Sequence, residues 1–197
     1  MGAGRQRTFD KGDALIKAME VFWQKGFSGA SLNDLTEAMG INKPSLYAAF
    51  GNKEELFVSA INQYVNAYGI PHFDKLLDTK SSLHERMQAY LESIAKLISD
   101  SKLPGGCFVT ASTCEAGSNC LPEGAVKTIL KINAASTKAF ISFFKDEQAK
   151  GNIVSTSSPE VLADYLLTIQ FGLAVMARNG IRRNRLEQVI NHAVSSF

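Results

Sequence analysis

The feature of this sequence that most restricts its fold is the spacing of its apolar residues, which recur every three or four positions. That spacing places them along one face of an α-helix. The clearest stripes cover residues 15–23, 56–68, 83–98 and 186–197. No segment of useful length alternates apolar and polar residues between hairpin turns, as a strand would. We therefore predict an all-α fold.

Clusters of glycine, proline and serine divide the helical pattern into segments. These breaks lie near residues 26–29, 40, 51, 69–71, 104–106, 117–122, 151, 157–159 and 180. They predict about nine helices, of which three are crowded before residue 51. The later helices are expected near residues 56–69, 83–99, 107–117, 123–149, 158–180 and 184–197.

Composition excludes several classes of protein. With 197 residues, of which 45% are hydrophobic and 20% charged, the chain can bury a core of its own. No window holds 18 consecutive apolar residues, and the first residues lack an apolar signal core, so we expect neither a membrane span nor secretion. Three cysteines, an odd number in a chain that needs no disulfides, favour the reducing cytoplasm.

Residues 31–50 carry the main functional signal. Ser31 is a good N-cap residue, and Asp34 stands in the following first turn, where a negative charge suits the helix dipole. Gly40 can adopt the left-handed conformation of a tight turn. Asn42 can cap a second helix in which Pro44 takes a tolerated early position. Two short helices joined by a tight turn are predicted, the second over residues 43–50.

Apolar and polar residues in this stretch are placed as a helix-turn-helix requires. The apolar set that would hold the two helices together is Leu35, Met39, Ile41 and Leu46. The set left to face outward is Lys43, Ser45, Tyr47 and Ala48. A short helix with small, hydroxyl and basic groups can enter a DNA major groove, which is about 12 Å wide. An ordinary helical corner packed into a core is the alternative.

The surrounding residues closely resemble the DNA-binding domain of the TetR family of transcriptional regulators, over about residues 8–57 without a gap. The resemblance rests on the Leu46-Tyr47 pair, on Phe50-Gly51, on Lys53 and on Leu56-Phe57. It departs at Thr36, where such motifs usually have alanine, but a threonine hydroxyl can bond to a carbonyl of its own helix. The resemblance implies a DNA-binding domain over residues 1–53 and a helical effector-binding and dimerisation domain over residues 54–197.

The resemblance also implies which residues contact the DNA backbone. Tyr47 and Lys53 match a tyrosine and a lysine that the family places on phosphates, and such contacts position the protein without reading sequence. Ser31 matches a position whose hydroxyl or backbone N–H meets phosphate.

Other residues are the candidates for contacts inside the grooves. Lys43 and Ser45 are the best candidates for base edges, and Ala48 can touch a thymine methyl. Arg5 and Arg7, ahead of the first helix, can reach the minor groove, although simple solvation is the alternative. The positive excess of the whole chain lies in residues 1–53, which favours a polyanionic partner near that end.

The two C-terminal helices, over residues 158–180 and 184–197, are predicted to form a homodimer. The first is apolar on more than one face, and Gly172 allows another helix to approach closely. The pair resembles the helices that form a four-helix dimer bundle in the family. The arginines nearby are expected on an exposed rim, with a second nucleic-acid site as the alternative. These are Arg178, Arg182, Arg183 and Arg185.

The helices between these regions supply the candidate effector site. In the family an effector pocket lies among the corresponding helices, and apolar and aromatic linings suit a small, largely apolar effector. The candidates are Tyr64, Tyr68, Met87, Tyr90, Phe108, Phe140 and Phe144. The same side chains can instead serve only to fill a core. We expect the helix over residues 52–69 to link this pocket to Lys53.

Three cysteines within 14 residues are a further candidate sensor. In a helix, Cys107 and Cys114 would be about 10.5 Å apart along the axis, too far for a disulfide, whereas Cys114 and Cys120 can meet through a loop. Sensing through a reactive thiol or a soft metal is one hypothesis, with distant ligands among His72, His84 and Glu115. Structural cysteines are the alternative, because no CxxC spacing is present.

No enzymatic motif competes with these hypotheses. The sequence lacks a nucleophile elbow, a phosphate-cradling glycine loop and an HExxH motif, so we predict no catalytic residue, cofactor or metal site. The function predicted is a ligand-responsive transcriptional repressor that binds pseudo-palindromic double-stranded DNA as a homodimer. A thiol- or metal-responsive regulator of the same fold and a helical adaptor that binds no DNA are the alternatives.

Overall fold

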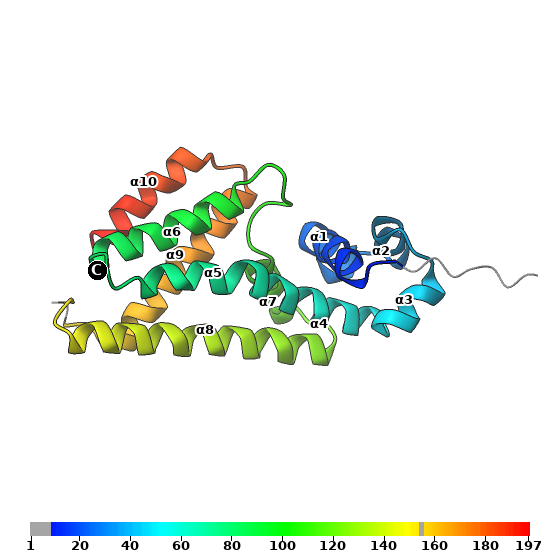
Figure 1. Cartoon of the computed structure of the whole chain (residues 1–197), viewed down its shortest axis with the longest axis horizontal. Coiled ribbons are helices and arrows are strands. Elements are labelled where there is room, and N and C mark those ends of the chain that lie inside the picture. The colour runs from blue at the N-terminus through cyan, green and yellow to red at the C-terminus, as the bar shows by residue number, and fades with distance from the viewer. Residues whose placement is uncertain (1–8, 154–155) are drawn as a thin grey trace, which may run out of the picture.

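The computed structural model describes residues 9–153 and 156–197, and every regular element among them is helical (Figure 1). The all-α prediction is therefore confirmed. Three helices precede residue 51, as expected: α1 (Lys11–Gly29), α2 (Leu32–Met39) and α3 (Lys43–Phe50). Arg5 and Arg7 lie outside the described residues.

The helical path does not break at residues 69–71, so that part of the prediction is wrong. After α4 (Lys53–Tyr64) the chain forms a π-helical turn (Val65–Gly69), continues as α5 (Ile70–Phe73) and ends in a 3-10 turn (Asp74–Leu77). The wide turn is closed by a hydrogen bond from Ile70 N–H to Val65 C=O. Such a turn accommodates Pro71, which has no N–H to donate to a regular helix.

Among the described residues after Leu77, five further α-helices follow. They are α6 (Leu83–Ile98), α7 (Phe108–Gly117), α8 (Glu123–Ala149), α9 (Pro159–Arg178) and α10 (Arg183–Val194). In Figure 1, α6, α9 and α10 gather at one end of the molecule and α1, α2 and α3 at the other. The long α8 packs against both α4 and α9. The helix α7 lies where the two ends meet.

Two clusters of buried side chains form the core. The N-terminal core contains Phe22, Trp23, Leu35, Leu46 and Phe57, and it continues into α7 and the first turns of α8. The packing is thus continuous across residue 53, and the domain boundary there stays a prediction. The C-terminal core joins the second half of α8 to α6, α9 and α10.

An ion pair is buried beside the C-terminal core. The guanidinium of Arg86 donates to both carboxylate oxygens of Glu147 and to the carbonyl of Leu76, and the two charged residues are only 5% and 1% exposed. Burial alone would raise the pKa of Glu147, but hydrogen bonds from Arg86, Asn152 and Lys150 outweigh burial and lower that pKa to about 2. This pair ties α6 to the end of α8, and nothing in the sequence predicted it.

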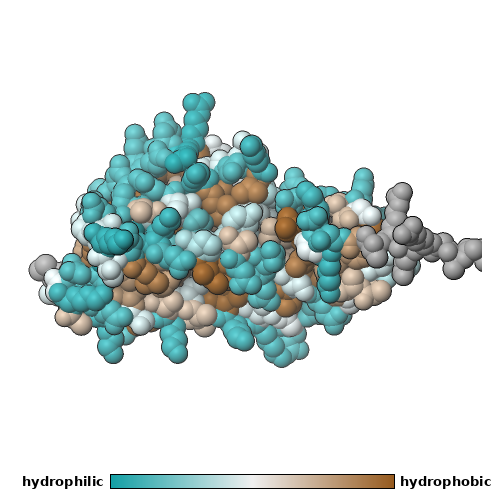
Figure 2. All heavy atoms as spheres, viewed as in Figure 1, coloured by the Kyte–Doolittle hydropathy of each residue, from teal (hydrophilic) through white to brown (hydrophobic). Residues whose placement is uncertain are grey.

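Hydrophilic and hydrophobic side chains gather in different places on the face shown in Figure 2. Figure 2 shows hydrophilic side chains along the α6–α10 side and along α8, with hydrophobic patches between them. By length and composition alone, α9 is long and apolar enough to cross a membrane. Only 28% of its most apolar 18 residues are buried within the protomer. A large apolar face of α9 therefore lacks cover within a single chain.

Candidate nucleic-acid interface

The start of α2 is fixed by a reciprocal cap. The Ser31 hydroxyl accepts a hydrogen bond from Asp34 N–H at 3.1 Å, and the Asp34 carboxylate accepts one from Ser31 N–H at 2.8 Å. Lys25 binds the same carboxylate at 2.6 Å, and the hydrogen bonds from Lys25 and Ser31 hold the pKa of Asp34 well below its usual range. The predicted N-cap is therefore confirmed. The Ser31 hydroxyl, which the family resemblance assigned to a contact with DNA phosphate, is engaged in this cap.

The turn and the start of α3 also follow the sequence prediction. Gly40 adopts a left-handed conformation, with φ 67° and ψ 27°. The side chain of Asn42 accepts from Ser45 N–H at 2.9 Å, and Pro44 lies in the first turn of α3. The hydroxyl of Thr36 donates to the carbonyl of Leu32 at 2.9 Å, as expected for a threonine at this position. Local hydrogen bonds thus set the geometry of both short helices.

One face of α3 packs inward and the other is open to a partner. Leu46 is fully buried and Phe50 is 8% exposed, whereas Tyr47 is 48% exposed. Lys43 and Ala48 are exposed as well, and Ser45 is half-buried. In Figure 1, α3 lies at the end of the molecule away from α6, α9 and α10. The outward-facing set predicted from the sequence therefore lies on an accessible helix.

Two further lysines lie beside this helix. The ammonium of Lys53, in the first turn of α4, is 4.3 Å from the ring centre of Phe27. Burial lowers the pKa of Lys53, and the nearby carboxylate of Glu115 opposes that effect. The ammonium of Lys11 is 5.0 Å from the ring centre of Phe50, at the end of α3. The sequence did not single out Lys11, because its position beside α3 depends on packing between distant helices.

Comparison with known proteins identifies the family. Residues 15–60 match the family described as "Bacterial regulatory proteins, tetR family". The transcriptional repressor ComR of Escherichia coli (strain K12) is 32% identical over 187 residues, which are 94% of this chain and 88% of ComR. The chain belongs to the TetR family. The repressor BdcR of the same organism is 31% identical over 90% of this chain and 83% of BdcR.

Solved structures of similar proteins agree with the fold. A cysteine variant of CifR, in a structure with 26-bp double-strand operator DNA, is 33% identical, with a TM-score of 0.86 over 98% of this chain and all of that chain. The reduced form of NemR from E. coli has a TM-score of 0.79, over 92% of this chain and 93% of that chain, at 20% identity, and supports the fold alone. The helix-turn-helix of this TetR-family chain is therefore α2, the turn at Gly40, and α3.

The candidate effector residues of the TetR-family chain are divided between the two cores. The N-terminal core contains Tyr64 and Phe108, with Tyr68 packed against it. The C-terminal core contains Met87, Tyr90, Phe140 and Phe144. The ring centres are 5.7 Å apart for Tyr64 and Phe108, and 5.9 Å apart for Tyr90 and Phe140. The structure does not gather the seven side chains around one space, and their role in binding stays a prediction.

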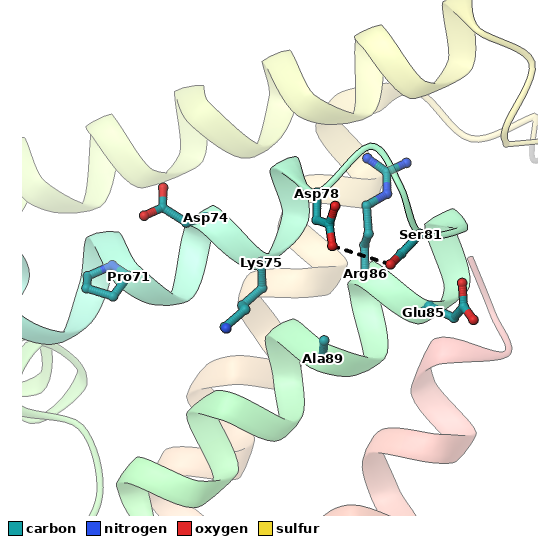
Figure 3. Close-up of a pocket in the computed structure, with 8 residues that line it drawn as sticks. All are labelled: Pro71, Asp74, Lys75, Asp78, Ser81, Glu85, Arg86 and Ala89. Carbon is teal, nitrogen blue, oxygen red and sulfur yellow. Dashed lines mark hydrogen bonds between the residues drawn. The ribbon is translucent and has the colours of Figure 1, made fainter.

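A surface hollow of about 450 Å³ lies between the turn after α5 and the start of α6 (Figure 3). Its lining is mostly polar or charged: Pro71, Asp74, Lys75, Asp78, Ser81, Glu85, Arg86 and Ala89. None of the predicted effector residues lines this hollow. An open, charged site of this kind does not suit the apolar effector that the sequence predicted.

The three cysteines have different surroundings. All three are free thiols; Cys107 is half-buried at the N-cap of α7, and Cys114 and Cys120 are exposed. Cys107 packs against both cores, and burial together with this nearby thiol raises the pKa of Tyr64 and of Tyr90. Of the three cysteines, Cys107 is therefore the one that packs against both cores.

The structure does not support the metal ligands considered from the sequence. Across residues 9–153 and 156–197, no group of three or more histidine, cysteine, aspartate or glutamate side chains is placed to hold a metal ion. The ring of His72 is hydrogen-bonded to the hydroxyl of Ser93 at 2.8 Å, and Glu115 accepts from Phe27 N–H at 3.1 Å.

Proposed function

We propose that this chain represses transcription by binding pseudo-palindromic operator DNA as a homodimer, and that a small effector releases it. The observation that carries the proposal is the exposed face of α3, which presents Lys43, Tyr47 and Ala48 on a helix-turn-helix of the TetR family. The similar CifR protein is solved with operator DNA bound. A regulator of this kind acts in the cytoplasm, where its DNA lies.

In the proposed complex, α3 enters the major groove and its neighbours hold the backbone. Lys43 and Ser45 contact base edges, and Ala48 contacts a thymine methyl. The hydroxyl of Tyr47 and the ammonium of Lys53 bind phosphates. The N-terminal end of α2 at Ser31 meets phosphate through backbone N–H groups, because the hydroxyl is already part of the cap.

The dimer in this proposal forms through the uncovered face of α9 together with α10. Large apolar side chains recur along one side of α9 at helical spacing and are exposed: Val161 (56%), Tyr165 (38%), Phe171 (36%) and Val175 (49%). Val189 of α10 is 38% exposed. A Cβ built on Gly172, on the same side of α9, would meet no atom within 4 Å. A second copy that buries this face would explain why so apolar a helix is left uncovered.

A selection experiment tests DNA binding. The protein is mixed with a library of randomised duplexes at about 50 mM salt, and bound duplexes are amplified and sequenced. We expect an inverted repeat whose half-sites lie one or more helical turns apart, each turn being about 34–36 Å. A chain carrying Lys43→Ala and Tyr47→Phe together is the control and should enrich this repeat poorly. No enriched sequence with the unaltered protein would contradict the proposal and favour the helical adaptor.

The effector is proposed to be small and largely apolar and to bind among the residues predicted from the sequence. These are divided between the N-terminal core (Tyr64, Tyr68 and Phe108) and the C-terminal core (Met87, Tyr90, Phe140 and Phe144). A thiol-responsive mechanism is the second candidate, favoured by the position of Cys107 between the two cores. Iodoacetamide separates the candidates. If the thiol is the sensor, alkylation should release DNA from the unaltered protein and from a Cys114→Ser, Cys120→Ser variant, but not from Cys107→Ser. Release that persists in Cys107→Ser would contradict a sensor at Cys107, and alkylation that never releases DNA from the unaltered protein would contradict the thiol mechanism.

A further inference from the structure

The C-terminal end of α1 is held by four segments that lie far away in the sequence. The indole N–H of Trp23 donates to the carbonyl of Gly105 at 3.1 Å. The guanidinium of Arg178, the last residue of α9, donates to the carbonyls of Trp23 and Gln24 at 3.2 and 2.9 Å. The carboxylate of Glu115 in α7 accepts from Phe27 N–H at 3.1 Å.

A fourth contact joins α1 to the loop between α7 and α8. The hydroxyl of Ser28 donates to the carbonyl of Cys120 at 3.0 Å. In Figure 1, α7 lies between α1 and the helices at the other end of the molecule. The end of α1 is therefore the place where the DNA-binding helices are attached to the rest of the chain by side-chain hydrogen bonds.

Two of these contacts replace a hydrogen bond that α1 has lost. In an unbroken helix, the N–H of Phe27 would donate to the carbonyl of Trp23, four residues earlier. Gly26 interrupts the helix with φ 72° and ψ 177°. The N–H of Phe27 instead donates to Glu115, and the carbonyl of Trp23 accepts from Arg178. Each half of the broken pair is thus completed by a charged side chain, which makes a strong hydrogen bond.

The kink and its two partners fit closely. A Cβ at Gly26 would overlap the Glu115 carboxylate, and its positive φ disfavours any other residue there. On the other side, a Cβ at Gly106 would lie 3.2 Å from Cβ of Arg178 and 3.1 Å from the carbonyl of Ala174. Glycines at positions 26 and 106 therefore permit the approach of both side chains. The sequence prediction placed Arg178 on an exposed rim; it is exposed, but its guanidinium is bound to α1.

Arg178 and Glu115 connect the DNA-binding helices to two different parts of the chain. Arg178 ends α9, the helix through which the dimer is proposed to form. Glu115 lies in α7, whose N-cap Cys107 packs against both cores. Since α1 packs against α2 and α4, a rotation of α1 on α9 would carry α3 with it. In a dimer, such a rotation changes the distance between the two copies of α3.

We propose that Arg178 and Glu115 are positioning residues for operator binding: they fix α1 on α9 and α7, and so set the separation of the two recognition helices. This inference rests on the proposed function. A dimer with a fixed separation binds one half-site spacing best, because recognition helices must meet successive faces of the duplex. Loss of either contact should therefore broaden the range of accepted spacings, even where the fold and the dimer are kept.

The test uses the repeat enriched by the unaltered protein, and duplexes in which its half-sites are moved apart or together in single base-pair steps. The affinity ratio between the best and the neighbouring spacing is measured by fluorescence anisotropy. We expect Arg178→Gln and Glu115→Ala to reduce this ratio about tenfold. Arg178→Lys keeps one donor and Glu115→Gln keeps an acceptor, so both should restore part of the ratio. Arg185→Gln, an exposed neighbour, is the matched control and should leave the ratio unchanged.

The outcomes separate this inference from the function on which it rests. A purely structural role would lower thermal stability or overall affinity and leave the spacing ratio as it was, and an unchanged ratio in both Arg178→Gln and Glu115→Ala would overturn the inference. If one of these two variants does not fold, the spacing ratio is measured instead in the conservative variant at that position, Arg178→Lys or Glu115→Gln, and in the variant at the other position. Failure of the unaltered protein to enrich any duplex would instead overturn the proposed function, and the inference with it.

Discussion

The N-terminal and C-terminal cores of this chain are stabilised in different ways. The N-terminal core is built from aromatic contacts, such as those of Phe22 with Phe57 and Trp23 with Tyr64, around short helices that carry their own caps. Its ion pair between Lys25 and Asp34 is at the surface. The C-terminal core depends in addition on a buried ion pair between residues 61 positions apart.

This difference separates local from long-range determinants of structure. Caps and tight turns fix the ends of α2 and α3 within a few residues, so the geometry of the proposed DNA-reading surface depends mainly on local sequence. The C-terminal core needs α6 and the end of α8 together to satisfy two buried charges. The two regions should therefore respond differently to substitution and to pH.

The largest effect is expected at the buried ion pair. Arg86→Ala leaves the carboxylate of Glu147 buried without its main partner, which should lower the free energy of unfolding by about 3–5 kcal/mol. Urea unfolding at neutral pH measures the change. The control is Arg183→Ala, which removes an exposed ion pair with Glu187 and should cost less than about 1 kcal/mol. Equal losses in the two variants would contradict the contrast between the cores.

A slightly smaller effect is expected from pH. Folding lowers the pKa of Glu147 from 4.5 to about 2, so its contribution to stability is complete above pH 4.5 and is lost as the pH falls through about 2. The loss amounts to about 3 kcal/mol. Urea unfolding across this range should show a steeper decline in the unaltered protein than in a variant carrying Arg86→Leu with Glu147→Leu. Parallel curves would show that Glu147 does not titrate as described.

Substitutions on α3 should change DNA binding without changing stability. Lys43→Ala is expected to alter the preferred base at one position, at a cost of about 1–3 kcal/mol there, whereas Tyr47→Phe should weaken all duplexes alike. Both side chains are exposed, so urea unfolding should be unaffected. Competition binding with single-base variants of the enriched duplex distinguishes the two effects. A uniform loss with Lys43→Ala would place this lysine on the backbone instead.

The smallest effect is expected at a cap of the N-terminal region. Asn42→Ala removes the acceptor for Ser45 N–H and should lower stability by about 1 kcal/mol, whereas Asn42→Gly should cost only a few tenths. Thermal unfolding measures both. If Asn42→Ala lowered the free energy of unfolding as much as Arg86→Ala does, the expected difference between a local cap and a buried long-range ion pair would be contradicted.

The sequence predicted the features that short-range chemistry determines. Ser31 and Asn42 were identified as caps because each acts on a residue three positions later, and Gly40 because a tight turn needs a left-handed residue. The inward position of Leu46 and the exposed position of Tyr47 follow from helical periodicity. Most of α2 and α3 was therefore accessible to sequence reasoning.

Contacts between distant residues were not accessible in this way. Arg86 and Glu147 look like ordinary surface charges in the sequence, and Arg178 looked like part of an exposed cluster. Pro71 suggested a helix end because the accommodating π-helical turn has no local signature. Nothing in the sequence showed that Cys107 would lie between the two cores, or that the aromatic candidates for an effector site would be divided between them. Each of these features depends on which helices pack together.

The most direct test of the central claim is the salt dependence and stoichiometry of binding to the enriched duplex. Fluorescence anisotropy gives the affinity at several salt concentrations, and sedimentation gives the number of protomers bound. With Lys43 and Lys53 of each protomer on phosphates or bases, at least about four charges are neutralised, and the logarithmic salt slope should be about −3.6 or steeper. Two protomers per duplex with such a slope are predicted. One protomer per duplex, or binding that is insensitive to salt, would contradict the account.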